Sequence, residues 1–134
     1  MYGFSVKLHG SFKEIVDCVT DDLKKEGFGI LTTIDVQKTL KDKLGIEQRP
    51  YLILGACNPQ LAHQALNQDP NIGLLLPCNV VVREENENNI IVSFMDPLII
   101  SNLANNSEIT KIAQDVRQRL ERVRKCLFGS KPSS

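Results

Sequence analysis

Apolar and polar residues alternate at the start of the chain, where Tyr2, Phe4, Val6 and Leu8 are separated by small or polar residues. A period of two predicts a half-buried strand over residues 2–8. The same pattern predicts a second strand over residues 28–34, and the apolar segment 51–57 predicts a third. Further strands are predicted on both sides of a polar turn at residues 84–89. The first belongs to the apolar run 72–83, where Pro77 marks a bulge, an edge or the true start of the strand.

Between these strands, apolar residues recur at the spacing of an α-helix. Ser11 and Glu14 form a capping box, and the apolar residues behind it repeat at helical spacing as far as a stop at Gly27. Shorter helices are predicted after the N-cap residues Asp35 and Asn58, and a short apolar turn is predicted after Asp96-Pro97. The longest helix carries apolar residues at intervals of 4, 3, 4, 3 and 4, namely Ile109, Ala113, Val116, Leu120, Val123 and Leu127.

Hairpins mixed with helical excursions favour an α+β fold, with a mostly antiparallel sheet and helices packed on one face. No strand is followed by a dinucleotide-binding or P-loop glycine pattern. We expect a single domain over residues 1–128, followed by a flexible C-terminal tail over 129–134.

Composition supports a globular protein of 134 residues with 42% apolar residues, and its sixteen basic and sixteen acidic side chains cancel. The chain shows neither a secretory signal nor an apolar run long enough for a membrane helix, so we expect no membrane partner and a cytoplasmic location in a bacterium or archaeon. The four cysteines then read as free thiols. Two of them, Cys18 and Cys126, lie beside apolar stripes and are interpreted as packing residues.

Candidate chemistry centres on the end of the third strand. Cys57 precedes the N-cap Asn58, where unpaired N–H groups of a helix favour a thiolate. Gly55 and Ala56 leave room for a ligand to approach the backbone. The alternative is a buried cysteine that acts as a small hydrophobe.

A second thiol, Cys78, stands beside Asn79 near a strand start, and His63 lies away from the apolar stripe of its own helix. If the two strands are antiparallel, Cys57, His63 and Cys78 could form a three-ligand metal site, or the thiols a pair. We therefore expect a small-ligand- or metal-binding protein, with no cofactor identified and the question of catalysis open. Thiol or sulfur redox chemistry at Cys57 is the alternative. The expected binding residues are Gly55, Ala56, Cys57, Asn58, His63, Cys78 and Asn79.

The last helix is locally basic, with seven basic residues against two acidic ones between Lys111 and Lys131. A solvated helix face accounts for this pattern, and a nucleic-acid-binding surface is the alternative, although few aromatic residues are available for base stacking. The apolar stripe of this helix is longer than a small sheet needs. We therefore expect a homodimer in which part of the stripe meets a second copy and the acidic turn 84–87 faces the basic patch 117–125.

Several segments together resemble the bacterial and archaeal family known as domain of unknown function 302. They are Gly55 to Pro59 with Ala62-His63, Ile72 to Val80, Asp96-Pro97, Gly27 to Leu31, Ile34 to Val36 and Lys41 to Gly45. The resemblance covers residues 3–100 closely and the last helix loosely. It implies a compact α+β fold, with helices on a curved sheet as in the TATA-binding protein, and a homodimer. It implies no established activity.

Overall fold

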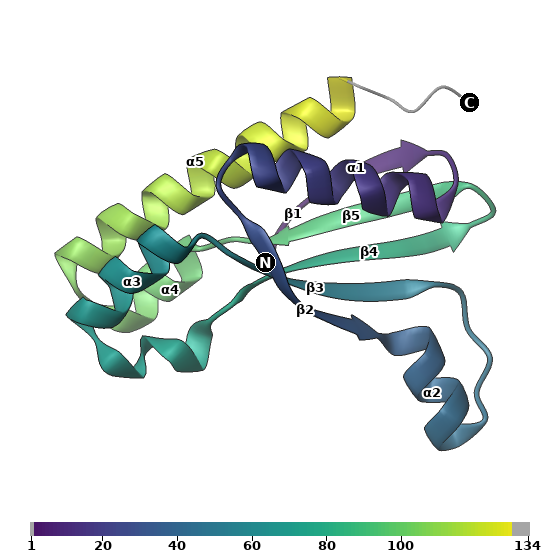
Figure 1. The fold of residues 1–134 in the computed structure, drawn as a ribbon, viewed down its shortest axis with the longest axis horizontal. Coiled ribbons are helices and arrows are strands. Elements are labelled where there is room, and N and C mark those ends of the chain that lie inside the picture. Colours follow the sequence, from purple (N-terminus) through teal and green to yellow (C-terminus); the bar gives the residue numbers. More distant parts are fainter. Residues whose placement is uncertain (1, 130–134) are drawn as a thin grey trace.

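The computed structural model describes residues 2–129, which form one sheet covered by helices (Figure 1). The strands are β1 (Gly3–His9), β2 (Gly29–Asp35), β3 (Tyr51–Cys57), β4 (Cys78–Asn86) and β5 (Asn89–Met95). The helices are α1 (Phe12–Lys25), α2 (Val36–Leu44), α3 (Pro59–Gln68), α4 (Leu98–Ala104) and α5 (Ser107–Gly129), with a 3₁₀ helix, η1 (Pro70–Leu75), between α3 and β4.

The sheet has the strand order β1-β5-β4-β3-β2, and every neighbouring pair is antiparallel. Alternating residues of each strand therefore share a face. The registers Leu54↔Val80, Val80↔Phe94 and Val6↔Val92 place buried side chains beside one another on one face.

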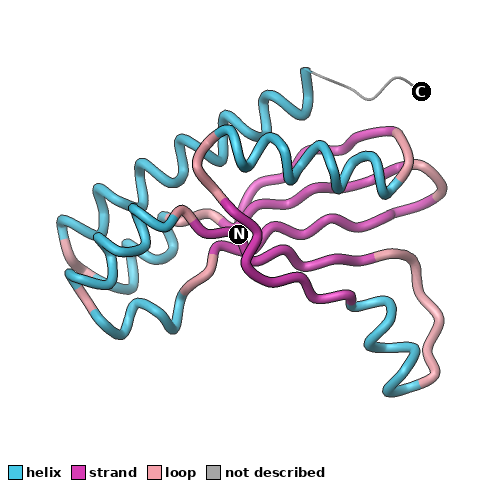
Figure 2. Tube along the Cα trace, viewed as in Figure 1, coloured by secondary structure: helices cyan, strands magenta, loops and turns pink. Residues whose placement is uncertain are grey.

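Helices α1 and α5 cover this apolar face, and Figure 2 shows both on the same side of the sheet. Ser11 caps α1 by accepting a hydrogen bond from the backbone N–H of Glu14, as the capping box predicts. Ile15, Val19 and Leu23 of α1 are fully buried against the sheet. The predicted α+β class, with an antiparallel sheet, helices on one face and a long C-terminal helix, is confirmed.

The stripe of α5 is buried along its whole length within its own chain. Ile109, Ala113 and Val116 are less than one tenth exposed, and Leu120, Val123 and Leu127 are at most 1% exposed. The prediction that part of this stripe remains free for a second copy is therefore wrong, because the sheet and the helices α1, α3 and α4 cover all of it.

The alternation predicted for the second strand breaks after Ile30. The pairing with β3 shifts between Ile30 and Thr32, so that Ile30 lies on the apolar face while Ile34 pairs with Ile53 on the opposite face. A one-residue shift in a strand reverses the direction of every later side chain. Ile34 is consequently 50% exposed instead of buried.

Helix α5 extends to Gly129, and the remainder of the expected tail, residues 130–134, lies outside the described residues. Within residues 2–129, none of the helices combines the length and the apolar character that crossing a membrane requires.

Truncating the centre of the α5 stripe tests this packing. Leu120→Ala removes a side chain with no exposed surface and should lower the free energy of unfolding by about 2–5 kcal/mol. Leu44→Ala is the matched control on α2, where the side chain is 64% exposed, and should cost less than about 0.5 kcal/mol. Urea denaturation measures both. Similar losses in the two variants would contradict the assigned core.

Candidate functional site

Asn58 fixes the junction between β3 and α3. Its Oδ1 accepts a hydrogen bond from the backbone N–H of Leu61 at 3.2 Å, which caps the helix, and Pro59 occupies the first helical turn. Its Nδ2 donates to the carbonyl oxygen of Glu26 at 3.5 Å, and Nη1 of Arg119 donates to the same oxygen at 2.9 Å. Asn58 is only 8% exposed, so its polar groups serve this junction.

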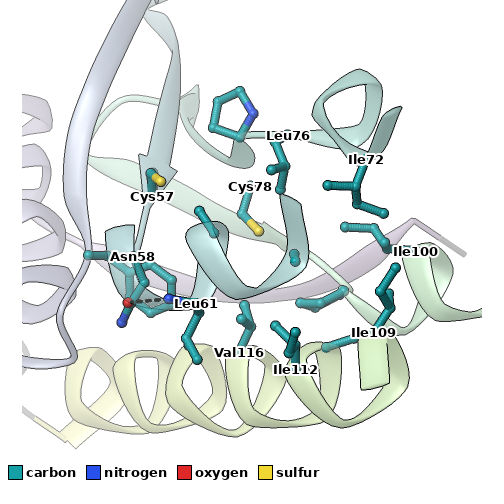
Figure 3. Close-up of a pocket in the computed structure, with 17 residues that line it drawn as sticks. Cys57, Asn58, Leu61, Ile72, Leu76, Cys78, Ile100, Ile109, Ile112 and Val116 are labelled. Carbon is teal, nitrogen blue, oxygen red and sulfur yellow. Dashed lines mark hydrogen bonds between the residues drawn. The ribbon is translucent and has the colours of Figure 1, made fainter. Parts of the chain in front are cut away.

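Behind this junction lies an apolar cavity of about 50 Å³. Figure 3 shows Leu76 and Cys78 on one side of it and Ile112 and Val116 of α5 on the other. The walls come from the ends of β3 and β4, from α3 and η1, and from α4 and α5. Among the described residues that line the cavity, only Asn58, Cys57 and Cys78 have polar or sulfur-bearing side chains.

Four of the seven residues expected to bind a ligand line the cavity: Ala56, Cys57, Asn58 and Cys78. Ala56 pairs with Cys78 across β3 and β4. The two strands are antiparallel, which is the condition under which the sequence places both thiols at the same end of the sheet. Ala56 is fully buried and Cys78 is 7% exposed, whereas Cys57 is half-buried at the strand end.

The two thiols are held in their neutral form. Burial, and to a smaller extent the negative charge that Cys57 would carry, raises the pKa of Cys78 to about 11. Burial also raises the pKa of the Cys57 thiol. The expectation that the start of α3 lowers the pKa of Cys57 is therefore wrong, because burial disfavours the charged thiolate. A lowered pKa, on which the hypothesis of a Cys57 nucleophile depends, is not present in this structure.

His63 lies away from the cavity. It is exposed on α3, where its Nε2 accepts from Nδ2 of Asn67 at a distance of 3.4 Å. Among residues 2–129, no three histidine, cysteine, aspartate or glutamate side chains are grouped so as to hold a metal ion. The three-ligand set of Cys57, His63 and Cys78 is consequently not assembled.

Gly55 and Asn79 pair with each other and lie on the opposite face of the sheet from Ala56. A Cβ atom at Gly55 would lie 2.2 Å from Oγ1 of Thr32 and 2.8 Å from Cγ of Pro77. The small residue at position 55 therefore makes room for these two side chains and does not open the backbone to a ligand.

Sequence reasoning missed the wall that α4, α5 and η1 supply. Ile72, Ile100 and Ile109 form a second cluster of buried residues beside the main core, together with Ala65. Ala113 of α5 also lines the cavity. Helical spacing predicted that several of these residues are buried. The cavity between them, however, depends on how the alanine side chains of two helices pack against each other.

The basic residues of α5 are largely matched within the chain. Arg117 pairs with Asp96 and Arg122 with Glu26, while Arg119 and Arg124 pair with carboxylates of α5 itself. These pairs support the interpretation of a solvated helix face. Cys18, Cys57 and Cys78 are free thiols, and Cys126 is exposed instead of packed.

The Cys78 environment predicts a specific loss of stability at alkaline pH. An unfolded chain ionises this thiol near the ordinary value of 9.0, whereas the folded chain resists ionisation up to about 11. The unfolded state therefore binds fewer protons in this window, and stability falls as the pH rises from 9 toward 11. Between pH 8 and 10 the free energy of unfolding should fall by about 1 kcal/mol less in Cys78→Ala than in the wild-type protein, as measured by urea denaturation. Cys126→Ala, at an exposed position, should leave the loss unchanged. An identical pH dependence in both variants would contradict this account.

Comparison with known proteins identifies the relatives of this fold. The model of a family described as domain of unknown function DUF302 matches residues 4–127. A similar solved structure is the crystal structure of an uncharacterized conserved protein DUF302 from Bacillus stearothermophilus. It is 31% identical, with a TM-score of 0.84, and the match covers 93% of this chain and 97% of that one. No functionally curated protein matches. The chain belongs to the DUF302 family.

Proposed function

We propose that this protein is a homodimer that binds a small apolar ligand in the cavity lined by Ala56, Cys57, Asn58 and Cys78. The observation that carries the proposal is the cavity itself. Its walls are apolar on nearly all sides, and they include residues that the sequence identified as candidate ligand-binding residues. No described residue in its lining is histidine, aspartate, glutamate, lysine or arginine, so the site favours binding over acid–base chemistry.

The size of the cavity limits the ligand. Its volume of about 50 Å³ is a third of the roughly 150 Å³ of an engineered apolar cavity that binds benzene. An apolar molecule of a few heavy atoms fits this space without rearrangement, and a larger one requires the walls to move. Apolar walls offer water too few hydrogen bonds, so a ligand has little water to displace.

The proposed entry lies beside the end of β3. Cys57, Leu76 and Pro77 line the cavity and are only half-buried, as are Ala62 and Ile112. The walls on the α4 side, including Ile72 and Ile100, are almost completely buried. A ligand that passes between Pro77 and α3 therefore crosses the least covered part of the wall.

Filling the cavity tests this site. Ala113→Val adds two methyl groups to its wall and should weaken the binding of a small apolar probe such as dichloromethane at least tenfold, because the probe's space is taken. Binding is measured by methyl chemical shifts in NMR titrations. Ala104→Val is the control, since Ala104 is a half-buried helical alanine outside the lining.

Thermal denaturation separates the possible outcomes. Ala113→Val should retain or raise the melting temperature, since it fills empty space, so weaker binding cannot be attributed to unfolding. A wild-type protein that binds no small apolar probe, or equal binding by Ala113→Val, would refute the proposed site.

The dimer is proposed to form along the edge of β2. This strand has seven residues, none of them lysine or proline, and it ends the sheet with its outer edge unpaired within residues 2–129. Leu31 and Ile34 on it are 66% and 50% exposed. The charged residue of this strand, Asp35, lies at its end and caps α2. Edge strands with few charged residues and no proline are templates for pairing with another chain. The acidic turn is less available, because Glu84 pairs with Arg49 and Glu85 with Lys7.

Charges on this edge should separate the dimer. We expect the wild-type protein to sediment as a dimer at tens of micromolar concentration and Leu31→Lys/Ile34→Lys to sediment as a monomer, because like charges oppose pairing of the edges. Leu74→Lys, at an 87% exposed position on η1, should remain dimeric. A monomeric wild-type protein contradicts the proposed assembly, and a dimeric double variant contradicts this edge as the interface.

A further inference from the structure

A second hollow lies on the face of the sheet opposite α1 and α5, and Figure 2 shows that side of the sheet free of both helices. It is a groove of about 420 Å³, within the usual range for small-molecule sites. Its lining includes Ser5, Tyr51, Asn79, Val81, Arg83 and Ser93. The groove is separate from the apolar cavity, and no residue lines both.

Strand register assembles this groove from three separate parts of the chain. Asn79, Val81 and Arg83 alternate along β4 and span about 13 Å on one face. Val81 pairs with Ser93 of β5, and Arg83 pairs with Tyr51 of β3. Val81 therefore forms an apolar floor, with hydrogen-bonding side chains around it.

Arg83 differs from every other arginine of this chain. Five of the six arginines form ion pairs with carboxylates of the chain, whereas Arg83 forms none with the described residues. It is half-buried, so its charge is only partly solvated. A guanidinium in this position favours an anion, because its fork of N–H donors matches the two oxygens of a carboxylate.

The surroundings leave this charge available. No aspartate or glutamate within residues 2–129 lines the groove. Glu85, two residues further along β4, forms an ion pair with Nζ of Lys7 at 2.9 Å. That lysine is the main cause of the lowered pKa of Glu85, and Arg83 contributes least. The groove therefore has an unmatched positive charge at one end.

We propose that this groove binds a small organic carboxylate with an apolar body. The carboxylate lies against the guanidinium of Arg83 and the hydroxyl of Tyr51, while the apolar body lies over Val81 toward Met95. Ser93 and Asn79 supply hydrogen bonds to polar substituents on the ligand. Ser5 and Ser93 already share a hydrogen bond of 2.7 Å, which orients one hydroxyl along this face.

A second copy of the chain fits this face less well. Pairing two such faces about a two-fold axis places two unmatched guanidinium groups in one interface, and burying like charges is costly. A small anion instead neutralises the charge within one chain.

The chain contains its own reporter for the groove. It has two tyrosines and no tryptophan, and both Tyr2 and Tyr51 line the groove. Intrinsic fluorescence therefore reports on this site. Cyclohexanecarboxylate is a suitable probe because it does not absorb where tyrosine is excited, and cyclohexanecarboxamide is its neutral counterpart.

We expect the carboxylate to change the tyrosine fluorescence saturably and to bind at least tenfold more tightly than the amide. Arg83→Gln should weaken carboxylate binding at least tenfold and leave amide binding unchanged, because it removes a charged hydrogen-bonding partner. Lys125→Gln removes a charge outside the groove and should have no such effect. Ala113→Val should also leave this binding unchanged, so failure of the apolar cavity and failure of the groove are distinguishable.

Three results would overturn the proposal. The first is no saturable response to the carboxylate, and the second is equal affinity for acid and amide. The third is a tyrosine signal that follows protein concentration and ignores the ligand, which would mean that a second copy covers the face.

Discussion

The apolar stripe of α5 crosses the covered face of the sheet and contacts α1, α3 and α4 as it does so. Each buried valine or leucine on it stabilises the fold by about 1.5–3 kcal/mol relative to exposure, so the stripe is a principal source of stability. Helix α5 is also hydrogen-bonded to the end of α1. Arg119 and Asn58 meet at the carbonyl oxygen of Glu26, which ties α5 to the junctions of α1 and α3.

The one-sided arrangement of helices gives the two faces of the sheet different chemistry. On the covered face, alanines of α3 and α5 line an apolar, uncharged cavity. The other face is not covered by α1 or α5, and serine, asparagine, tyrosine and arginine side chains surround Val81 there. The first environment suits an apolar ligand and raises thiol pKa values, whereas the second leaves a positive charge open to an anion.

Local patterns in the sequence predicted the elements well. The alternation in β1, the capping box of α1 and the stripe of α5 each depend on neighbours within a few residues. The reversal after Ile30, the filling of space beside Gly55 and the pairing of Arg122 with Glu26 depend on contacts between distant segments. The same holds for the sites. The sequence singled out Cys57 and Cys78, but whether they lie close together depended on the direction of their strands. Neither the gap beside Ala113 nor the pairing of Arg83 with Tyr51 has a local signature.

Xenon binding tests the central claim, a functional apolar cavity behind α3, most directly. Xenon enters empty apolar cavities because it needs no hydrogen bonds. A crystal exposed to xenon under pressure should show a strong xenon peak between Ala65, Cys78 and Ala113. A peak anywhere else with none in this space, or ordered water within it, would contradict the account.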